Sequence, residues 1–172
     1  MRGGRQAGFT LIEVLVVMVI ITIIISVAAV RFGPDDSDIA QREAERLALL
    51  LETARDEAIA AGTTLGWAPD QRMTGYGFWQ QEGPDQWQPL TDNDALRRRP
   101  LPPNTMLQSV TVNLAPLGKD AKISFSPSGV NAPFSLEVRT GDAVRHLIAD
   151  PLGRITVQPP GAGVPAPGAR PQ

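Results

Sequence analysis

Few residues in this chain are of the types that carry out chemistry. The sequence has 172 residues, no cysteine and one histidine, which is His146. Thiolate metal sites, disulfides and cysteine nucleophiles are therefore excluded, and sites built on several histidines are excluded as well. His146 has no triad partner in its neighbourhood and is expected to be a surface or half-buried residue of a strand. With no catalytic constellation and no glycine-rich phosphate loop, the sequence predicts a protein that is not an enzyme and needs no cofactor.

Glu13 is the acidic residue in the most unusual setting, because it interrupts the apolar segment of residues 9–30. As a helix this segment would be about 33 Å long, enough to cross a hydrocarbon core of roughly 30 Å. A charge inside a bilayer is costly, so Glu13 either reaches the headgroups from the helix end or has a cationic partner. If the chain is cut after Gly8, the new Phe9 amine and Glu13 are at i and i+4 on one helix face, and the amine of a neighbouring subunit could neutralise Glu13.

The motif Gly8-Phe9-Thr10-Leu11-Ile12-Glu13 follows a short basic leader and opens the apolar segment. It resembles the signal of type IV prepilins. The resemblance implies cleavage between Gly8 and Phe9 by a prepilin peptidase and methylation of the Phe9 amine. It also implies that Glu13 sets the register of subunits during filament assembly. The expected product is a single-pass protein of the bacterial inner membrane with a periplasmic globular domain, although arginines on both sides of the segment leave its orientation open from charge alone.

The rest of the chain predicts an α+β fold, in which a long N-terminal transmembrane helix precedes a second helical segment packed on an antiparallel sheet or β-sandwich. Apolar residues recur at helical spacing from Leu47 to Ala61, acidic residues open this helix, and Gly62 suits its end. Short alternating segments follow, with strands expected at 74–80, 105–114, 121–126, 134–140, 144–149 and 154–158. The expected parts are a leader (1–8), a membrane and filament-core helix (9–30), a helix leading into the globular domain (31–62), an antiparallel β domain (63–158) and a disordered Pro/Gly-rich tail (159–172).

Residues 123–157 resemble the H-type minor pseudopilin of type II secretion. The matching features are Phe125-Ser126-Pro127-Ser128-Gly129, a strand pair at 134–140 and 144–150, and Gly153-Arg154-Ile155-Thr156-Val157. The resemblance implies a structural subunit near the tip of the pseudopilus in protein export. It also implies that the partners are the other minor pseudopilins, the major pseudopilin and the prepilin peptidase. The alternative is a minor pilin of a type IV pilus that takes part in DNA uptake or adhesion.

Several other polar or aromatic clusters could have a functional role, but each also has a structural explanation. Arg97-Arg98-Arg99 could contact DNA, but a solvated loop is favoured, and the net charge of −2 argues against a nucleic-acid binder. Thr91-Asp92-Asn93-Asp94 has oxygens suited to calcium but lacks the full loop pattern, so a turn is expected. Three acids near the start of the second helix, Asp35, Asp36 and Asp38, suit the helix dipole better than a metal. Trp67, Trp79 and Trp87 are expected to anchor the sheet or an interface, and no metal site is predicted.

Overall fold

The computed structural model describes residues 10–31 and 35–159. It separates into two units, Met1–Asp35 and Asp36–Gln172, and each is described by itself. The predicted leader (1–8) lies outside the described residues, as do Phe9 and all of the predicted tail beyond Pro159.

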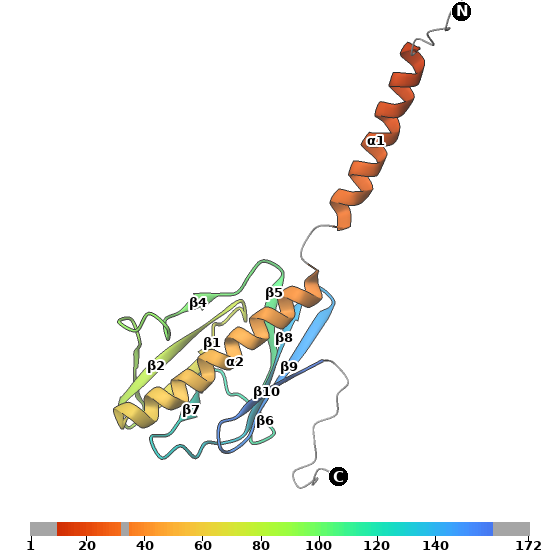
Figure 1. The fold of residues 1–172 in the computed structure, drawn as a ribbon. Coiled ribbons are helices and arrows are strands. Elements are labelled where there is room, and N and C mark those ends of the chain that lie inside the picture. Colours follow the sequence, from red (N-terminus) through yellow and green to blue (C-terminus); the bar gives the residue numbers. More distant parts are fainter. Residues whose placement is uncertain (1–9, 32–34, 160–172) are drawn as a thin grey trace, which may run out of the picture. The chain divides into compact units, whose positions relative to one another are not determined.

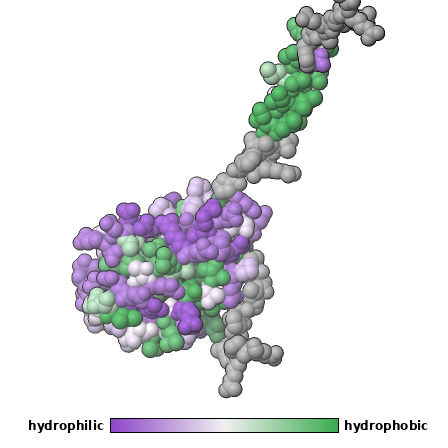
Figure 2. Space-filling view, in the orientation of Figure 1, coloured by the Kyte–Doolittle hydropathy of each residue, from purple (hydrophilic) through white to green (hydrophobic). Residues whose placement is uncertain are grey.

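The first unit contains one helix in its described part, α1 (Leu11–Arg31) (Figure 1). Its described side chains, from Leu11 to Ser26, are all exposed, and Figure 2 shows an almost wholly hydrophobic surface on the side in view. The hydroxyls of Thr22 and Ser26 donate to the carbonyl oxygens of Met18 and Thr22 at 2.8 Å, so these two hydroxyls are satisfied within the helix. Across residues 10–31 and 35–159, no helix reaches both the length and the hydropathy needed to cross a membrane.

The second unit begins with α2 (Asp36–Ala61), which has Asp36 and Asp38 in its first turn. Acidic groups at this end interact favourably with the helix dipole. Its buried face consists of small and branched apolar residues, which are Ala40, Ala44, Leu47, Ala48, Leu51, Ala54 and Ala58. The predicted stripe is confirmed at its centre. Leu50 is only partly buried and Ala61 is exposed, whereas the buried face continues toward the helix start through Ala40 and Ala44.

Two antiparallel sheets follow α2 (Figure 1). The first sheet has the order β3-β2-β1-β7, with β4 paired to β2. Its strands are β1 (Leu65–Pro69), β2 (Gly75–Gly83), β3 (Gln86–Pro89), β4 (Arg99–Pro100) and β7 (Ile123–Phe125). The second sheet has the order β10-β9-β8-β5-β6. Its strands are β5 (Thr105–Val112), β6 (Ala115–Pro116), β8 (Phe134–Thr140), β9 (Ala143–Ala149) and β10 (Ile155–Gln158).

One hydrophobic core joins α2 to both sheets. Its largest fully buried side chains include Trp67 and Phe78 from the first sheet and Leu136 and Leu147 from the second. Alternation buries every second residue of β8, so one face of the second sheet lies in this core and the other carries polar groups. The α+β fold class, with a helix packed on antiparallel sheets, is confirmed.

Polar side chains also tie α2 to the second sheet, which the sequence patterns did not indicate. Arg145 of β9 donates to Gln41 Oε1 at 2.6 Å and to Ser37 Oγ at 2.7 Å. Near the other end of the helix, Glu52 accepts a hydrogen bond from the amide of Ile155 at 3.1 Å. These bonds fix the helix along the sheet, because each side chain has a partner from a segment about a hundred residues away in the chain.

Strand bounds differ from the sequence expectation where the backbone turns sharply. β5 ends at Val112 instead of residue 114, because Asn113 (φ 51°) and Leu114 (φ 65°) form a left-handed turn into β6. Ser109 (φ 50°) lies in an irregularity of the β5–β8 pairing, between Gln108 and Thr111. β8 has the predicted bounds, whereas β1, β3, β4 and β6 were not predicted at all.

Candidate functional site

The N-terminal motif is only partly within the described residues, since Gly8 and Phe9 lie outside them and Glu13 lies inside. Thr10 caps α1. Its carbonyl oxygen accepts hydrogen bonds from the amides of Glu13 at 3.1 Å and Val14 at 3.3 Å, and its hydroxyl accepts a longer one from the Glu13 amide at 3.4 Å. Thr10 and Glu13 therefore have the Thr-x-x-Glu spacing of a capping box, a local signal that the sequence reasoning missed.

Glu13 itself is exposed in the first turn of an otherwise apolar helix. Within the described part of the chain its carboxylate makes no ion pair. A carboxylate is favoured at this end of a helix by the dipole, so its presence there does not weaken the isolated helix.

The second candidate region is the outer face of the first sheet, which points away from α2. Leu65 and Trp67 of β1 and Tyr76 and Phe78 of β2 are buried in the core. Because strand residues alternate in direction, the intervening residues point outward. The register pairs Gly66 with Trp79 and Ala68 with Gly77 on this outer face.

Two tryptophans lie on this face above glycines. A Cβ at Gly66 would lie 2.6 Å from the Trp87 ring, and one at Gly77 would lie 3.1 Å from the Trp79 ring. The ammonium of Lys122 lies 5.1 Å from the centre of the Trp79 ring and 5.3 Å from that of Trp87. Both distances are within the range of cation–π attraction. A side chain at Gly66 would displace the Trp87 ring, and one at Gly77 would make a tight contact with the Trp79 ring, so both glycines favour this arrangement of the indoles.

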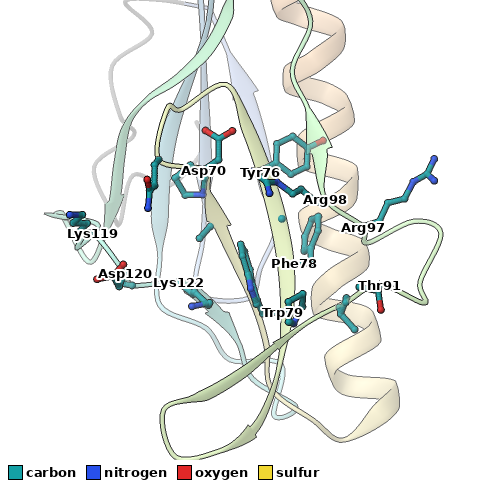
Figure 3. Close-up of a pocket in the computed structure, with 17 residues that line it drawn as sticks. Asp70, Tyr76, Phe78, Trp79, Thr91, Arg97, Arg98, Lys119, Asp120 and Lys122 are labelled. Carbon is teal, nitrogen blue, oxygen red and sulfur yellow. The ribbon is translucent and has the colours of Figure 1, made fainter.

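A groove of about 680 Å³ crosses this face and is called the outer groove below. Its floor is formed by β1 and β2, and its two banks are the segments 89–98 and 119–122 (Figure 3). Arg97 and Thr91 lie on one side in Figure 3, and Lys119 and Asp120 lie on the other, with Trp79 and Lys122 between them. A smaller hollow lined by Met73, Val110 and Leu117 shares the β1 end of the groove and continues it.

Two arginines of the triplet, Arg97 and Arg98, line this groove, whereas Arg99 does not. Arg99 turns inward and donates to the carbonyl oxygens of Asp94 at 2.8 Å and Ala95 at 3.4 Å. Arg97 and Arg98 are exposed, and neither makes a hydrogen bond or an ion pair within residues 35–159. Asn93, expected in a turn, accepts hydrogen bonds from the amides of Ala95 and Leu96 in such a turn.

The other candidate residues from the sequence analysis do not form a common site in the structure. His146 is partly buried and lies 3.5 Å from Glu137 on the neighbouring strand. Trp67 is in the core, apart from Trp79 and Trp87 on the outer face. Among the described residues, no three His, Cys, Asp or Glu side chains are grouped so that they could hold a metal ion. Asp36 and Asp38 occupy the first turn of α2, where the dipole accounts for them, and Asp35 immediately precedes the helix.

Comparisons with known proteins relate both parts of the chain to one system. The family model of the type II transport protein GspH matches residues 43–153, and that of the prokaryotic N-terminal methylation motif matches residues 3–29. The type II secretion system protein H of Aeromonas hydrophila is 27% identical over 176 residues, which cover 90% of this chain and 94% of that protein.

Solved structures show the same fold. The crystal structure of the minor pseudopilin EpsH from the type II secretion system of Vibrio cholerae matches with a TM-score of 0.60 and 20% identity, covering 76% of this chain and all of that one. The type IV minor pilin FimU of Pseudomonas aeruginosa matches less well, with a TM-score of 0.51 and 17% identity over 69% of this chain and 92% of that one. The GspH match covers more than half of the chain. The chain therefore belongs to the GspH family of type II transport proteins, and its homologues are minor pseudopilins of type II secretion.

Proposed function

We propose that this chain is a structural subunit near the tip of a type II secretion pseudopilus, where it joins other minor pseudopilins to the major pseudopilin during protein export. The observation that carries the proposal is the pairing, in one chain, of an N-terminal methylation motif (3–29) with a GspH domain (43–153). The first supplies a means of insertion and assembly, and the second identifies the kind of filament. The role is structural, in keeping with the family.

The proposed anchor is the apolar segment 9–30, which holds the precursor in the inner membrane with the globular domain in the periplasm. The support is its sequence, which is apolar except for Glu13 and a few hydroxyl-bearing residues. The same exposed apolar side chains on α1 would later pack against equivalent helices in the filament. One helix would thus serve first in the bilayer and then in the filament core.

In this proposal, cleavage of the leader produces the positive charge that pairs with Glu13. A prepilin peptidase cuts between Gly8 and Phe9, and the new amine of Phe9 is methylated but stays cationic. The carboxylate of Glu13, which has no ion-pair partner in the described residues, then accepts the Phe9 amine of a neighbouring subunit. Charges buried in an apolar surround require such pairing, so it would fix the register of adjacent helices.

Mass spectrometry of the protein purified from its host tests the processing step. The expected N-terminus is an N-methylated Phe9, and a bulky residue in place of Gly8 should leave the precursor uncut. Deletion of the gene should leave proteins exported by type II secretion in the periplasm. An intact Met1 terminus in a protein that restores export would contradict the proposal.

Substitution of Glu13 tests the assembly step. Glu13→Gln and Glu13→Leu should both insert and be cleaved, because removing a charge does not oppose either process. Both should be captured several-fold less by neighbouring subunits, because the Phe9 amine loses its counter-charge. The measurement is cross-linking in cells, with cleaved subunit compared to captured subunit. Equal capture of the wild type and both variants would leave Glu13 without a role in register.

The similarity to FimU keeps a type IV minor pilin as a second candidate. A minor pilin that takes up DNA should carry a continuous basic surface and bind DNA in a salt-sensitive way. The two functions separate in the deletion strain. Loss of export with intact pili supports the pseudopilin, and loss of pili with intact export supports the minor pilin.

A further inference from the structure

We propose that the outer groove binds an extended acidic segment of a partner protein. This goes beyond the proposed function, because it rests on the globular unit alone and assigns a binding surface to a face that the N-terminal motif does not involve. Four features of the groove carry it: small residues in part of its floor, cations on both banks, banks that are held in place, and aromatic rings that are already occupied.

Small residues form one part of the groove floor, next to the Trp79 ring. Ala68 and Gly77 are directly paired across β1 and β2 at this position, and both point outward. The Trp79 ring lies over Gly77, so an extended chain can approach the sheet over Ala68, beside that ring.

Positive charge lines both banks. Arg97 and Arg98 belong to one bank, and Lys119 and Lys122 belong to the other. In Figure 3 the Arg97 side chain points away from Trp79, and Lys122 lies next to Trp79. The groove also contains two carboxylates, but that of Asp70 already accepts hydrogen bonds from the amides of Arg72 and Thr74 at 3.0 Å each. The groove is therefore net positive, whereas the chain has a formal net charge of −2. A ligand with carboxylates along both of its sides fits this arrangement.

Both banks are held in place before any ligand arrives. On the first bank, Leu96 is fully buried, and Arg99 and Asn93 bond the backbone around it, so Arg97 and Arg98 project from a fixed loop. On the second bank, a turn closes between the Ala121 amide and the Gly118 carbonyl oxygen at 3.1 Å. Such preorganisation reduces the entropy lost on binding.

The aromatic rings favour a polypeptide over a nucleic acid. Lys122 lies over the rings of both Trp79 and Trp87, so these rings are not open platforms for stacking bases. Asp70 and Asp120 lie among the cations and would repel a continuous run of phosphates. An acidic peptide can alternate carboxylates with neutral residues and avoid both carboxylates.

The test uses the full chain in detergent micelles and a fluorescein-labelled peptide of alternating Glu and Ser. The peptide has about ten residues, which extend to about 33 Å. A peptide with Gln in place of every Glu is the matched probe. Binding is followed by fluorescence anisotropy and by the intrinsic fluorescence of the tryptophans. The wild type should bind the Glu peptide and not the Gln peptide, with affinity that falls as salt is raised.

Charge-reversal variants inside and outside the groove distinguish binding in the groove from a general effect of the protein's net charge. The double variant Arg97→Glu, Arg98→Glu should lower the affinity about tenfold, since it removes two attractions and adds two repulsions. The double variant Arg42→Glu, Arg154→Glu has the same net charge and alters exposed arginines outside the groove, so it should bind like the wild type. Lys119→Glu on the opposite bank should also weaken binding several-fold.

Four results would overturn the proposal. They are no binding by the wild type, equal binding of the Glu and Gln peptides, equal weakening by the two double variants, or no effect of Lys119→Glu. A single-stranded oligothymidine added as a third probe tests the other class of ligand. If it binds more tightly than the Glu peptide and the Arg97→Glu, Arg98→Glu variant abolishes that binding, the groove binds nucleic acid instead. None of these measurements depends on filament assembly, so their failure is distinct from failure of the proposed function.

Discussion

At the scale of one residue, Tyr76 shows how burial in the core changes the pKa of an ionisable side chain. Its side chain is 1% exposed, and its ring centre lies 6.1 Å from those of both Trp67 and Phe78. Burial raises the pKa of Tyr76 above its ordinary value of 10.0, and Glu43 raises it further, whereas Arg46 and Arg99 lower it. Burial dominates because the charged phenolate would lose its hydration among apolar neighbours.

The raised pKa predicts a loss of stability in alkaline solution. The neutral form is favoured in the folded state, so the contribution of Tyr76 is fully present below pH 10 and is lost as the pH rises above 10 through the folded pKa. The chain has one tyrosine, so tyrosinate absorbance reports this residue alone. The absorbance should develop at higher pH in the folded protein than in urea, and Tyr76→Phe should unfold with a weaker dependence on pH. Coincident titrations in the folded and unfolded states would contradict the burial argument.

The three tryptophans show what residue type alone could not decide. The sequence predicts that all three anchor the sheet or an interface. In the structure they lie on different faces of the first sheet, because side chains alternate in direction along a strand. Trp67 points into the core, where its indole N–H finds no hydrogen-bond acceptor among the described residues. Trp79 points outward because it alternates along β2 with the buried Phe78. The outer groove could not be predicted, since its banks at 89–98 and 119–122 come from segments that are distant from β1 in the chain.

At the scale of elements, α2 is the part that local sequence describes best. Its apolar stripe, acidic start and glycine stop all act within a few turns of the chain, so its periodicity is visible without tertiary contacts. Gly62 has φ 65°, and the amide of Thr63 donates to the Ala58 carbonyl oxygen at 3.2 Å. This is the geometry of a Schellman motif, in which glycine is favoured because a Cβ would strain the left-handed backbone.

A substitution at Gly62 should therefore destabilise the domain through backbone strain alone. A Cβ at this position would meet nothing within 4 Å, so no clash contributes. Gly62→Ala should lower the free energy of unfolding by about 1 kcal/mol. The matched control is Gly118→Ala, where the new Cβ would make an ordinary contact of 3.6 Å with Ala121 and the backbone is not left-handed. Urea unfolding of both variants measures the difference, and equal stabilities would show that the α2 stop does not depend on glycine.

The strands were less predictable than α2, because several of them form through pairing with neighbouring strands and have no clear pattern in their own sequence. β8 alternates buried and partly buried residues along its length and was predicted with its true bounds. β1 contains Gly66 and Pro69, which are unfavourable in strands, and it is formed because β2 and β7 pair with it on both sides. β3 is an edge strand with little burial and no apolar alternation. Edge strands of this kind carry almost no signal in one sequence.

At the scale of the whole molecule, the hydrophobic core belongs entirely to the second unit. Its buried cluster runs from Ala44 to Ala149, and every member comes from α2, the two sheets or the loops that join them. A unit with its own core is expected to fold independently. The fragment of residues 31–172 should therefore be monomeric, rich in β-structure with one substantial helix, and should unfold cooperatively by circular dichroism and ultracentrifugation.

The same core predicts that the sheets cannot fold without α2. The helix supplies Leu47, Leu51 and several alanines to the cluster, and the inner faces of both sheets would meet water in its absence. A sheet needs a second layer to bury its apolar face. The fragment of residues 63–172 should therefore lack a cooperative thermal transition, whereas residues 31–172 retain it. If the shorter fragment melts as cooperatively as the longer one, the helix is an accessory to a self-sufficient β domain. If neither fragment melts cooperatively, the second unit depends on the N-terminal segment and does not fold by itself.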